Sequence, residues 1–169
     1  ISVNQSRLLL YNPGYVDTLI DLVDRYEIPH HLIELEITET VVFEDKMVAI
    51  KTFKQLLDRG FKISMDDFGS GYSSLNMLKD IDVNIIKIDR AFLENFMNTE
   101  RGKKVMFSIL GLIRELDLIS VAEGVETKEQ LDFLKEAGCH WVQGYYFSKP
   151  VPVLDFLKKL DIEALSNIF

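Results

Sequence analysis

A predicted strand ends in two adjacent carboxylates in the stretch Ile63-Ser64-Met65-Asp66-Asp67-Phe68-Gly69-Ser70-Gly71-Tyr72-Ser73-Ser74-Leu75. Apolar and polar residues alternate from Phe61 to Met65, as they do in a strand with one buried face. Neighbouring side chains on a strand point to opposite faces, so Asp66 and Asp67 can converge only where the backbone turns. Two close carboxylates raise each other's cost of ionisation, and a divalent cation between them would offset that cost. The stretch therefore predicts a metal site, with a solvated Asp-Gly-Ser turn as the alternative.

The composition is that of one ordinary domain with a core of its own. The chain has 169 residues, 47% hydrophobic residues and a formal net charge of −8. This charge argues against a nucleic-acid polymer as partner, although bound cations could still let the protein hold a small anion. Cys139 is the only cysteine, which excludes an internal disulfide and suits a reducing compartment, so we expect a cytoplasmic location. No apolar run approaches the ~20 residues of a membrane span and no signal peptide is visible, so this segment should make no membrane contact.

Strand-like and helix-like patterns alternate six times along the chain, which predicts parallel βα units. The expected strands cover residues 1–4, 32–38, 61–65, 83–88, 120–125 and 141–147. The expected helices cover residues 13–26, 43–59, 75–79, 102–116, 127–137 and 152–160, and a further short helix could occupy 161–169. Thr127 and Gln130 have the spacing of a capping box at the start of one of these helices.

Two architectures share this alternation, an open doubly wound sheet and a (β/α)8 barrel of the TIM type. No glycine-rich phosphate fingerprint follows the first strand, and this absence argues against the open doubly wound sheet. Polar residues recur at the C-terminal ends of the strands, where barrels gather their sites; these residues are Asn4, Glu36, Asp66, Asp67, Lys87, Glu123 and Gln143. A barrel has eight units in typically ~250 residues, so about six units would lie in this chain.

The chemistry of these side chains points to a hard metal ion. Carboxylate and amide oxygens select Mg²⁺, Mn²⁺ or Ca²⁺ over zinc. Two metals bridged by Asp66 would activate a water and hold a phosphodiester for in-line attack. Lys87 could orient that water or stabilise developing charge, and Glu123 could bind the second metal or take the proton.

Taken together, the motifs resemble the EAL domain family of cyclic di-GMP phosphodiesterases, which produce linear pGpG. The matching stretches occur in the family's order and cover nearly the whole chain; they are Ser2-Val3-Asn4, Glu36-Ile37-Thr38-Glu39, Asp66-Asp67-Phe68-Gly69-Ser70-Gly71-Tyr72-Ser73-Ser74-Leu75, Lys87-Ile88-Asp89-Arg90, Ala122-Glu123-Gly124-Val125-Glu126-Thr127 and Gln143-Gly144-Tyr145-Tyr146-Phe147-Ser148-Lys149-Pro150. The resemblance implies a (β/α)8-type barrel with one antiparallel strand.

The resemblance also implies a role for each matching residue. The first metal would be held by Asn4, Glu36 and Asp66, and the second by Asp66 and Asp67 with Glu123 nearby. The metals would be Mg²⁺ or Mn²⁺, with Ca²⁺ as an inhibitor or substitute. Catalysis would involve Lys87, Glu123 and Asp67, and substrate binding Gln143, Glu126 and Asp89. Glu39 would hold the loop that contains Gly69, Ser70 and Gly71, because a carboxylate can accept hydrogen bonds from loop amides and hydroxyls.

One departure from the family pattern is the absence of its Glu-Ala-Leu motif from the first strand. Glu163-Ala164-Leu165 spells the same letters but follows the last strand, and we interpret it as chance. The true motif, which carries another metal ligand, should lie upstream of Ile1. We therefore expect an N-terminally incomplete EAL domain over residues 1–169, weak or inactive alone. We also expect a homodimer, with an upstream sensory or GGDEF-type domain fused to it or regulating it.

Two other functions remain open on the sequence. The domain could be a degenerate receptor that binds cyclic di-GMP without cutting it. It could also be an unrelated barrel aldolase with Lys87 as the Schiff-base nucleophile. The second is disfavoured because a lysine among several acids stays charged and is a poor nucleophile.

Overall fold

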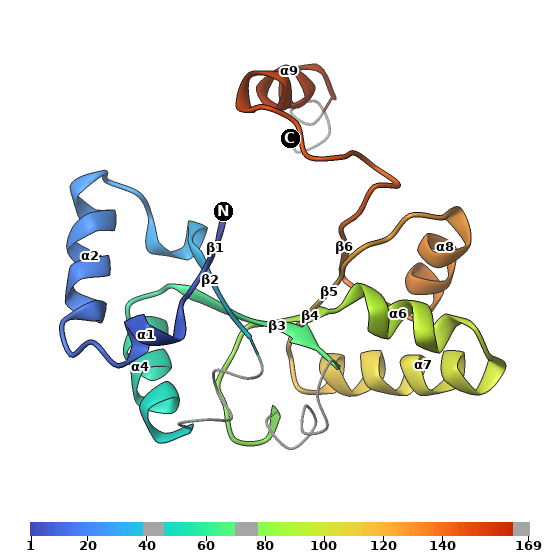
Figure 1. The fold of residues 1–169 in the computed structure, drawn as a ribbon, viewed down its shortest axis with the longest axis horizontal. Helices are drawn as coiled ribbons and strands as arrows, with labels where there is room; N and C mark the ends of the chain where they lie inside the picture. The colour runs from blue at the N-terminus through green and yellow to red at the C-terminus, as the bar shows by residue number, and fades with distance from the viewer. Residues whose placement is uncertain (39–45, 70–77, 164–169) are drawn as a thin grey trace.

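Parallel pairing joins six strands into one sheet in the computed structural model, which describes residues 1–38, 46–69 and 78–163, with side chains as far as Lys158 (Figure 1). The strands are β1 (Ser2–Asn4), β2 (Glu34–Thr38), β3 (Lys62–Phe68), β4 (Ile85–Ile88), β5 (Ile119–Ala122) and β6 (Trp141–Val142). Each strand pairs with the next one along the chain. This order has no reversal among the described strands, which excludes a doubly wound sheet and agrees with a barrel wall.

Helices connect the strands along one side of the sheet. They are α1 (Arg7–Leu10), α2 (Tyr15–Arg25), the 3₁₀ helix η1 (His30–Leu32), α4 (Lys46–Asp58), α6 (Arg90–Met97), α7 (Glu100–Glu115), α8 (Lys128–Glu136) and α9 (Val153–Glu163). Figure 1 shows α9 standing apart from the other helices. In the described part of the chain, no helix is both long and apolar enough to cross a membrane.

The core lies between the central strands and the helices that cover them. Ile63, Met65 and Ile86 are fully buried, and Phe53 of α4 and Met106 of α7 are at most 1% exposed. Strands of a parallel sheet are covered on both faces, which explains why residues 63–65 of β3 and all of β4 are buried on both sides of the sheet. Few polar residues of the described strands are buried, and they include Glu36 of β2 and Lys87 of β4.

The predicted order of the six strands is confirmed, but several boundaries were wrong. β3 was predicted to end at Met65 and continues to Phe68, while β5 and β6 end earlier than predicted. β5 ends because Gly124 turns the chain at φ +66°. Gly144 lies against the Val125 backbone, where an added Cβ would be 2.1 Å from the Val125 carbonyl oxygen, so residues 144–147 cannot continue β6. The predicted helices 43–59 and 75–79 lie partly outside the described residues.

Local capping accounts for one success and one omission. Thr127 and Gln130 form the predicted capping box at the start of α8. Helix α6 was not predicted, although Asp89 caps it by accepting hydrogen bonds from the backbone N–H groups of Ala91 and Phe92. An Asp directly after an apolar strand serves equally as a strand-end ligand and as an N-cap, so its type alone did not reveal the helix.

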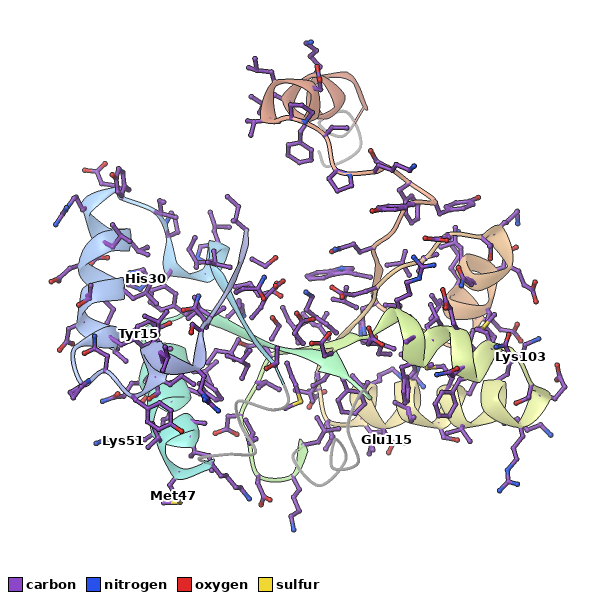
Figure 2. All side chains as sticks on the ribbon, viewed as in Figure 1. Tyr15, His30, Met47, Lys51, Lys103 and Glu115 are labelled. Atoms are coloured by element: carbon purple, nitrogen blue, oxygen red, sulfur yellow. The ribbon has the colours of Figure 1, made fainter. Side chains whose placement is uncertain are left out.

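His30 ties three segments together near α2 (Figure 2). Its Nδ1 lies 2.7 Å from the Arg59 carbonyl oxygen and its Nε2 lies 2.8 Å from Asp24 Oδ1. Its ring stacks on Phe61 with the centroids 4.5 Å apart. A carbonyl and a carboxylate both accept, so this geometry favours the imidazolium form, in which both ring nitrogens donate. The hydrogen bonds to Arg59 and Asp24 raise the pKa of His30 above its ordinary value.

This geometry predicts a pH-dependent contribution of His30 to stability. Because the folded pKa is raised, the contribution is fully present below the unfolded pKa of about 6.5 and is lost as the pH rises through the folded value. We expect His30→Gln to lower the melting temperature at about pH 5.5 and to leave it nearly unchanged at about pH 8.5. Thermal unfolding across this range measures the effect, with His31→Gln, a change at the exposed neighbouring histidine, as the matched control. An equal loss at both pH values would contradict the imidazolium assignment.

Candidate functional site

The Lys87 side chain gathers three carboxylates at the C-terminal ends of the strands. Its Nζ lies 2.7 Å from Glu36 Oε1, 2.7 Å from Glu123 Oε1 and 3.3 Å from Asp66 Oδ1. Lys87 is 6% exposed and Glu36 is 8% exposed. These four residues, the Lys87 cluster, come from β2, β3, β4 and the turn after β5, as the sequence predicted for residues at one rim of a barrel.

Strand periodicity and register explain why these side chains meet. Lys87 lies between Ile86 and Ile88, which point to the opposite face of β4 and are fully buried there. Thr38 of β2 pairs with Asp66 of β3, which sets Asp66 at the end of β2 rather than beside Glu36. The three carboxylates thus reach Lys87 from different strands and from different positions along the strand direction.

The cluster carries more negative than positive charge. Burial lowers the pKa of Lys87, but hydrogen bonds to Glu123 and Glu36 outweigh that effect and raise it above its ordinary value. Burial raises the pKa of Glu123, with the Asp66 and Glu36 charges adding to it and Lys87 opposing it. Lys87 is therefore an ammonium at neutral pH, and Glu123 takes up a proton more readily than an exposed glutamate does.

A bulge in β3 resolves how two adjacent acids can serve one site. Met65 pairs with Ile86 and Phe68 pairs with Ile88, so β3 has one residue more than β4 over this span. Asp67 lies in this bulge with φ 56°, a left-handed conformation that is uncommon for a residue other than glycine. The predicted turn at a strand end is therefore a bulge within the strand.

The second acid is sensitive to the charges around it. Burial raises the pKa of Asp67, the neighbouring Asp66 and Asp89 carboxylates raise it further, and Lys87 opposes them. Asp67 thus lies in the field of the Lys87 cluster, on a backbone that the bulge has turned away from a regular strand.

The donor set fits a hard cation. Asp66 Oδ1 is buried and makes no hydrogen bond, although it lies at ion-pair distance from Lys87. A buried carboxylate oxygen without a hydrogen bond is costly, and a cation would satisfy it. As placed, the described residues form no ready-made group of three metal-ligating side chains, and the Lys87 ammonium lies among the carboxylates. Asn4 pairs with Glu36 at the exposed edge strand, so its amide oxygen would complete the set from that side.

The loop residues named from the sequence are described only in part. Gly69 follows β3 with φ +99°, and an added Cβ would lie 2.2 Å from the Phe92 ring. The close approach of Phe92 and the left-handed backbone both require glycine at this position. Glu39, Ser70 and Gly71 lie outside the described residues.

A cavity of about 660 Å³, the strand-end pocket, opens beside Glu123. Its lining brings together two of the predicted substrate-binding residues, Glu126 and Gln143. Asp89, the third, is not among the residues that line it, and its Oδ1 caps α6. The lining consists of Arg90, Glu123, Gly124, Glu126, Gln143, Gly144, Tyr145, Ser148, Lys149, Pro150, Val151 and Phe156.

Sequence reasoning assigned no role to three of these residues, Arg90, Tyr145 and Lys149. Arg90 pairs with Glu126 and Glu94, and Lys149 Nζ lies 5.6 Å from the centroid of the Tyr145 ring. All three belong to stretches that matched the family pattern. The signal was therefore present in the sequence, but a basic or aromatic residue in a motif does not reveal what it contacts.

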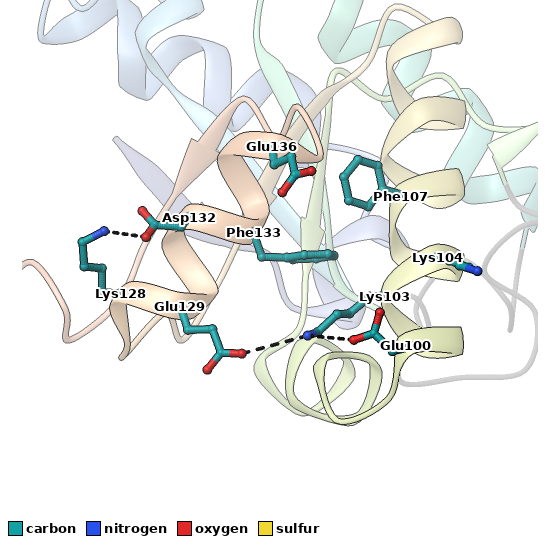
Figure 3. Close-up of a pocket in the computed structure, with 9 residues that line it drawn as sticks. All are labelled: Glu100, Lys103, Lys104, Phe107, Lys128, Glu129, Asp132, Phe133 and Glu136. Atoms are coloured by element: carbon teal, nitrogen blue, oxygen red, sulfur yellow. Dashed lines mark hydrogen bonds and ion pairs between the residues drawn. The ribbon is translucent and has the colours of Figure 1, made fainter.

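A second cavity of similar volume lies between α7 and α8 (Figure 3). Lys103 pairs there with Glu100 at 3.3 Å and with Glu129 at 4.0 Å, and Phe107 packs edge-to-face on Phe133. None of the predicted site residues belongs to its lining. Of these two cavities, the strand-end pocket is the one whose lining includes a member of the Lys87 cluster, Glu123.

Comparison with known proteins agrees with this geometry. Residues 1–150 match the EAL domain family model. The chain is 36% identical over 158 residues to the probable cyclic di-GMP phosphodiesterase PdeG of Escherichia coli, covering 94% of this chain and 31% of that protein. It is 39% identical over 158 residues to the bifunctional diguanylate cyclase/cyclic di-GMP phosphodiesterase MucR of Pseudomonas aeruginosa, covering 93% and 23%. The chain thus spans less than a third of these relatives' lengths.

Solved structures show the same fold. The MucR phosphodiesterase in complex with c-di-GMP superposes with a TM-score of 0.84 at 36% identity, covering 92% of this chain and 63% of that one. The EAL domain of Mycobacterium smegmatis DcpA gives a TM-score of 0.87 at 32% identity, covering 95% and 72%. The six parallel units described here correspond to part of a TIM-like barrel. The family match over most of the chain, together with the Lys87 cluster at the strand ends, establishes that this chain belongs to the EAL domain family.

Proposed function

We propose that residues 1–169 form most of a metal-dependent phosphodiesterase domain that hydrolyses cyclic di-GMP to linear pGpG. The observation that carries the proposal is the convergence of Glu36, Asp66 and Glu123 on Lys87, beside a pocket large enough for a ligand. The EAL phosphodiesterases are metal-dependent, and the buried Asp66 Oδ1, which makes no hydrogen bond, supports a cation at this site.

The proposed metal is Mg²⁺ or Mn²⁺, with Ca²⁺ as an inhibitor or substitute. Asn4, Glu36 and Asp66 would hold one ion, and Asp66, Asp67 and Glu123 a second. Bound divalent cations of this kind supply Lewis-acid polarisation of a phosphoryl oxygen and lower the pKa of a bound water.

The chain's own residues would act around that chemistry. Lys87 fixes the carboxylates of Glu36 and Glu123 and presents an ammonium that can hydrogen-bond the attacking water or the phosphoryl oxygen. Glu123, whose pKa is raised mainly by burial, can hold a proton released at the site. Glu126 and Gln143 would bind the nucleotide in the strand-end pocket. A contact of Asp89 with substrate stays a prediction, and its Oδ1 already accepts two backbone hydrogen bonds.

The alternatives differ in what they require of the same residues. A receptor would use the strand-end pocket without hydrolysis. The Schiff-base alternative requires a neutral amine at Lys87, whereas its hydrogen bonds to carboxylates raise the lysine pKa and keep it charged. We therefore keep the receptor as the second candidate and discard the aldolase.

The relatives suggest a regulatory partner beyond cyclic di-GMP. Relatives of this chain are several-fold longer than it is, and MucR is named as bifunctional. We propose an upstream sensory or GGDEF-type domain as the regulatory partner and a homodimer as the assembly.

Asp66→Asn tests the metal site. In the complete domain, this change removes a ligand charge from both proposed ions without changing the shape of the side chain. We expect hydrolysis of cyclic di-GMP with Mg²⁺ or Mn²⁺ to fall at least ~100-fold while the melting temperature stays close to that of the wild type. Glu129→Gln, which removes a carboxylate from the groove between α7 and α8, is the matched control and should hydrolyse normally.

Near-normal turnover by Asp66→Asn would overturn the metal assignment. Tight binding of cyclic di-GMP by the wild-type domain without any hydrolysis would instead favour the receptor. Isothermal titration with the nucleotide and with Mn²⁺ separates these outcomes, because the receptor would keep nucleotide affinity whether or not metal binds.

A second test concerns residues 1–169 alone. The terminal strands β1 and β6 pair on one side only among the described strands, and Val3 and Trp141 on them are 45% and 56% exposed. An unpaired sheet edge associates with other chains, and the apolar surface exposed there costs ~25 cal/mol per Å². We expect the isolated chain either to self-associate or to have a lower melting temperature than the complete domain. We also expect it to hydrolyse cyclic di-GMP more slowly than the complete domain does. Solution mass, thermal unfolding and turnover measure this, and a cooperative monomer with full activity would refute it.

A further inference from the structure

The 123–126 turn carries two acidic pocket residues and is packed tightly on both sides. Glu123 at its start reaches Lys87, and Glu126 at its end lines the strand-end pocket. On one side, Gly144 lies so close to Val125 that no side chain would fit between them. Hydrogen bonds from Val125 N–H to the Gln143 carbonyl and from Tyr146 N–H to the Val125 carbonyl secure that side.

Arg90 holds the other side of the turn. Its stem lies against Gly124, where an added Cβ would be 2.6 Å from the Arg90 Cβ and Cγ atoms. Its Nη1 donates to Glu126 Oε1 at 2.6 Å, and its Nε donates to Glu94 Oε1 at 2.7 Å. Glu94 lies one turn further along α6 and holds the Arg90 guanidinium in place from the helix. The guanidinium in turn holds Glu126 at the end of the turn.

The charge balance of the pocket depends on the same contact. Glu123 and Glu126 both line the strand-end pocket, and a phosphodiester ligand would be anionic. Without countercharges these carboxylates would repel such a ligand; Lys87 pairs with Glu123, and the Arg90 guanidinium pairs with Glu126. The Arg90 side chain is 49% exposed, so solvent screens its ion pair with Glu126 and the pair adds little to the free energy of unfolding. Its main effect is on the electrostatic potential in the pocket.

We propose that Arg90 is a positioning residue that holds the 123–126 turn in place and, by pairing with Glu126, keeps the strand-end pocket receptive to an anionic nucleotide. The inference rests on the proposed function for the identity of the nucleotide, and on the geometry of Arg90, Gly124 and Glu126 for the role of the arginine. A lysine could supply the charge but could not span Glu94 and Glu126 from a planar fork.

The test uses the complete domain with cyclic di-GMP as the probe. For Arg90→Ala, we expect the dissociation constant of cyclic di-GMP to rise about tenfold when it is measured with Ca²⁺, which suppresses turnover. We expect kcat with Mg²⁺ to fall less than about threefold. Arg90→Lys should recover part of the affinity, and Glu94→Gln should weaken binding in the same direction by less. Lys128→Gln, which removes another helical ion pair away from the pocket, is the matched control and should leave binding unchanged.

A double-mutant cycle separates this role from a merely structural one. In the Glu126→Gln background the pocket carboxylate that pairs with Arg90 is gone and only Glu94 on α6 remains, so Arg90→Ala should weaken binding clearly less there than in the wild type. The same loss in both backgrounds, or no loss in either, would overturn the inference.

Failure of the proposed function would look different. If the wild-type domain neither bound nor hydrolysed cyclic di-GMP, the function would fall, and amide hydrogen exchange would still test the positioning role. Arg90→Ala should then speed exchange in the 123–126 turn relative to Lys128→Gln, and unchanged exchange would reject the role.

Discussion

The ammonium of Lys87 is the feature on which the rest of the site depends. A barrel rim that gathers Glu36, Asp66 and Glu123 would be destabilised by their mutual repulsion if they were left alone in a partly dry interior. One buried cation relieves most of that repulsion and sets the distances among the acids. Three carboxylates facing one ammonium leave the cluster with an excess of acidic groups, and the proposed divalent ion would meet that excess. The lysine thus lowers the repulsion that the fold must tolerate without removing the acids that the proposed metal site needs.

Much of the fold could be predicted from the sequence because its signals are local. Alternating apolar residues around Ile63 and Met65, and the capping pair Thr127 and Gln130, depend on neighbours a few residues away. The failures came where distant contacts decide. β6 ends at Val142 because the backbone of Val125 lies against Gly144, and nothing within residues 141–147 shows that contact.

The site divides in the same way. The residues that meet at Lys87 could be predicted, since the carboxyl ends of parallel strands share one rim. The bulge that places Asp67 in a left-handed conformation could not be predicted, because an Asp-Asp pair has the same composition with or without an extra residue in the register. Arg90 was overlooked because its partners, Glu94 and Glu126, belong to different elements.

The simple succession of β1 to β6 across the sheet also has a consequence for how the molecule forms. Every strand pairs with its immediate predecessor, so most contacts join segments that leave the ribosome close together in time. The Lys87 cluster is the exception, since Glu36 and Lys87 are 51 residues apart and Glu123 follows later still. During synthesis the growing sheet therefore carries the acids of β2 and β3 before their countercharge has emerged. The sheet can grow strand by strand, whereas the chemistry at its rim is assembled only when β4 and the turn after β5 have docked.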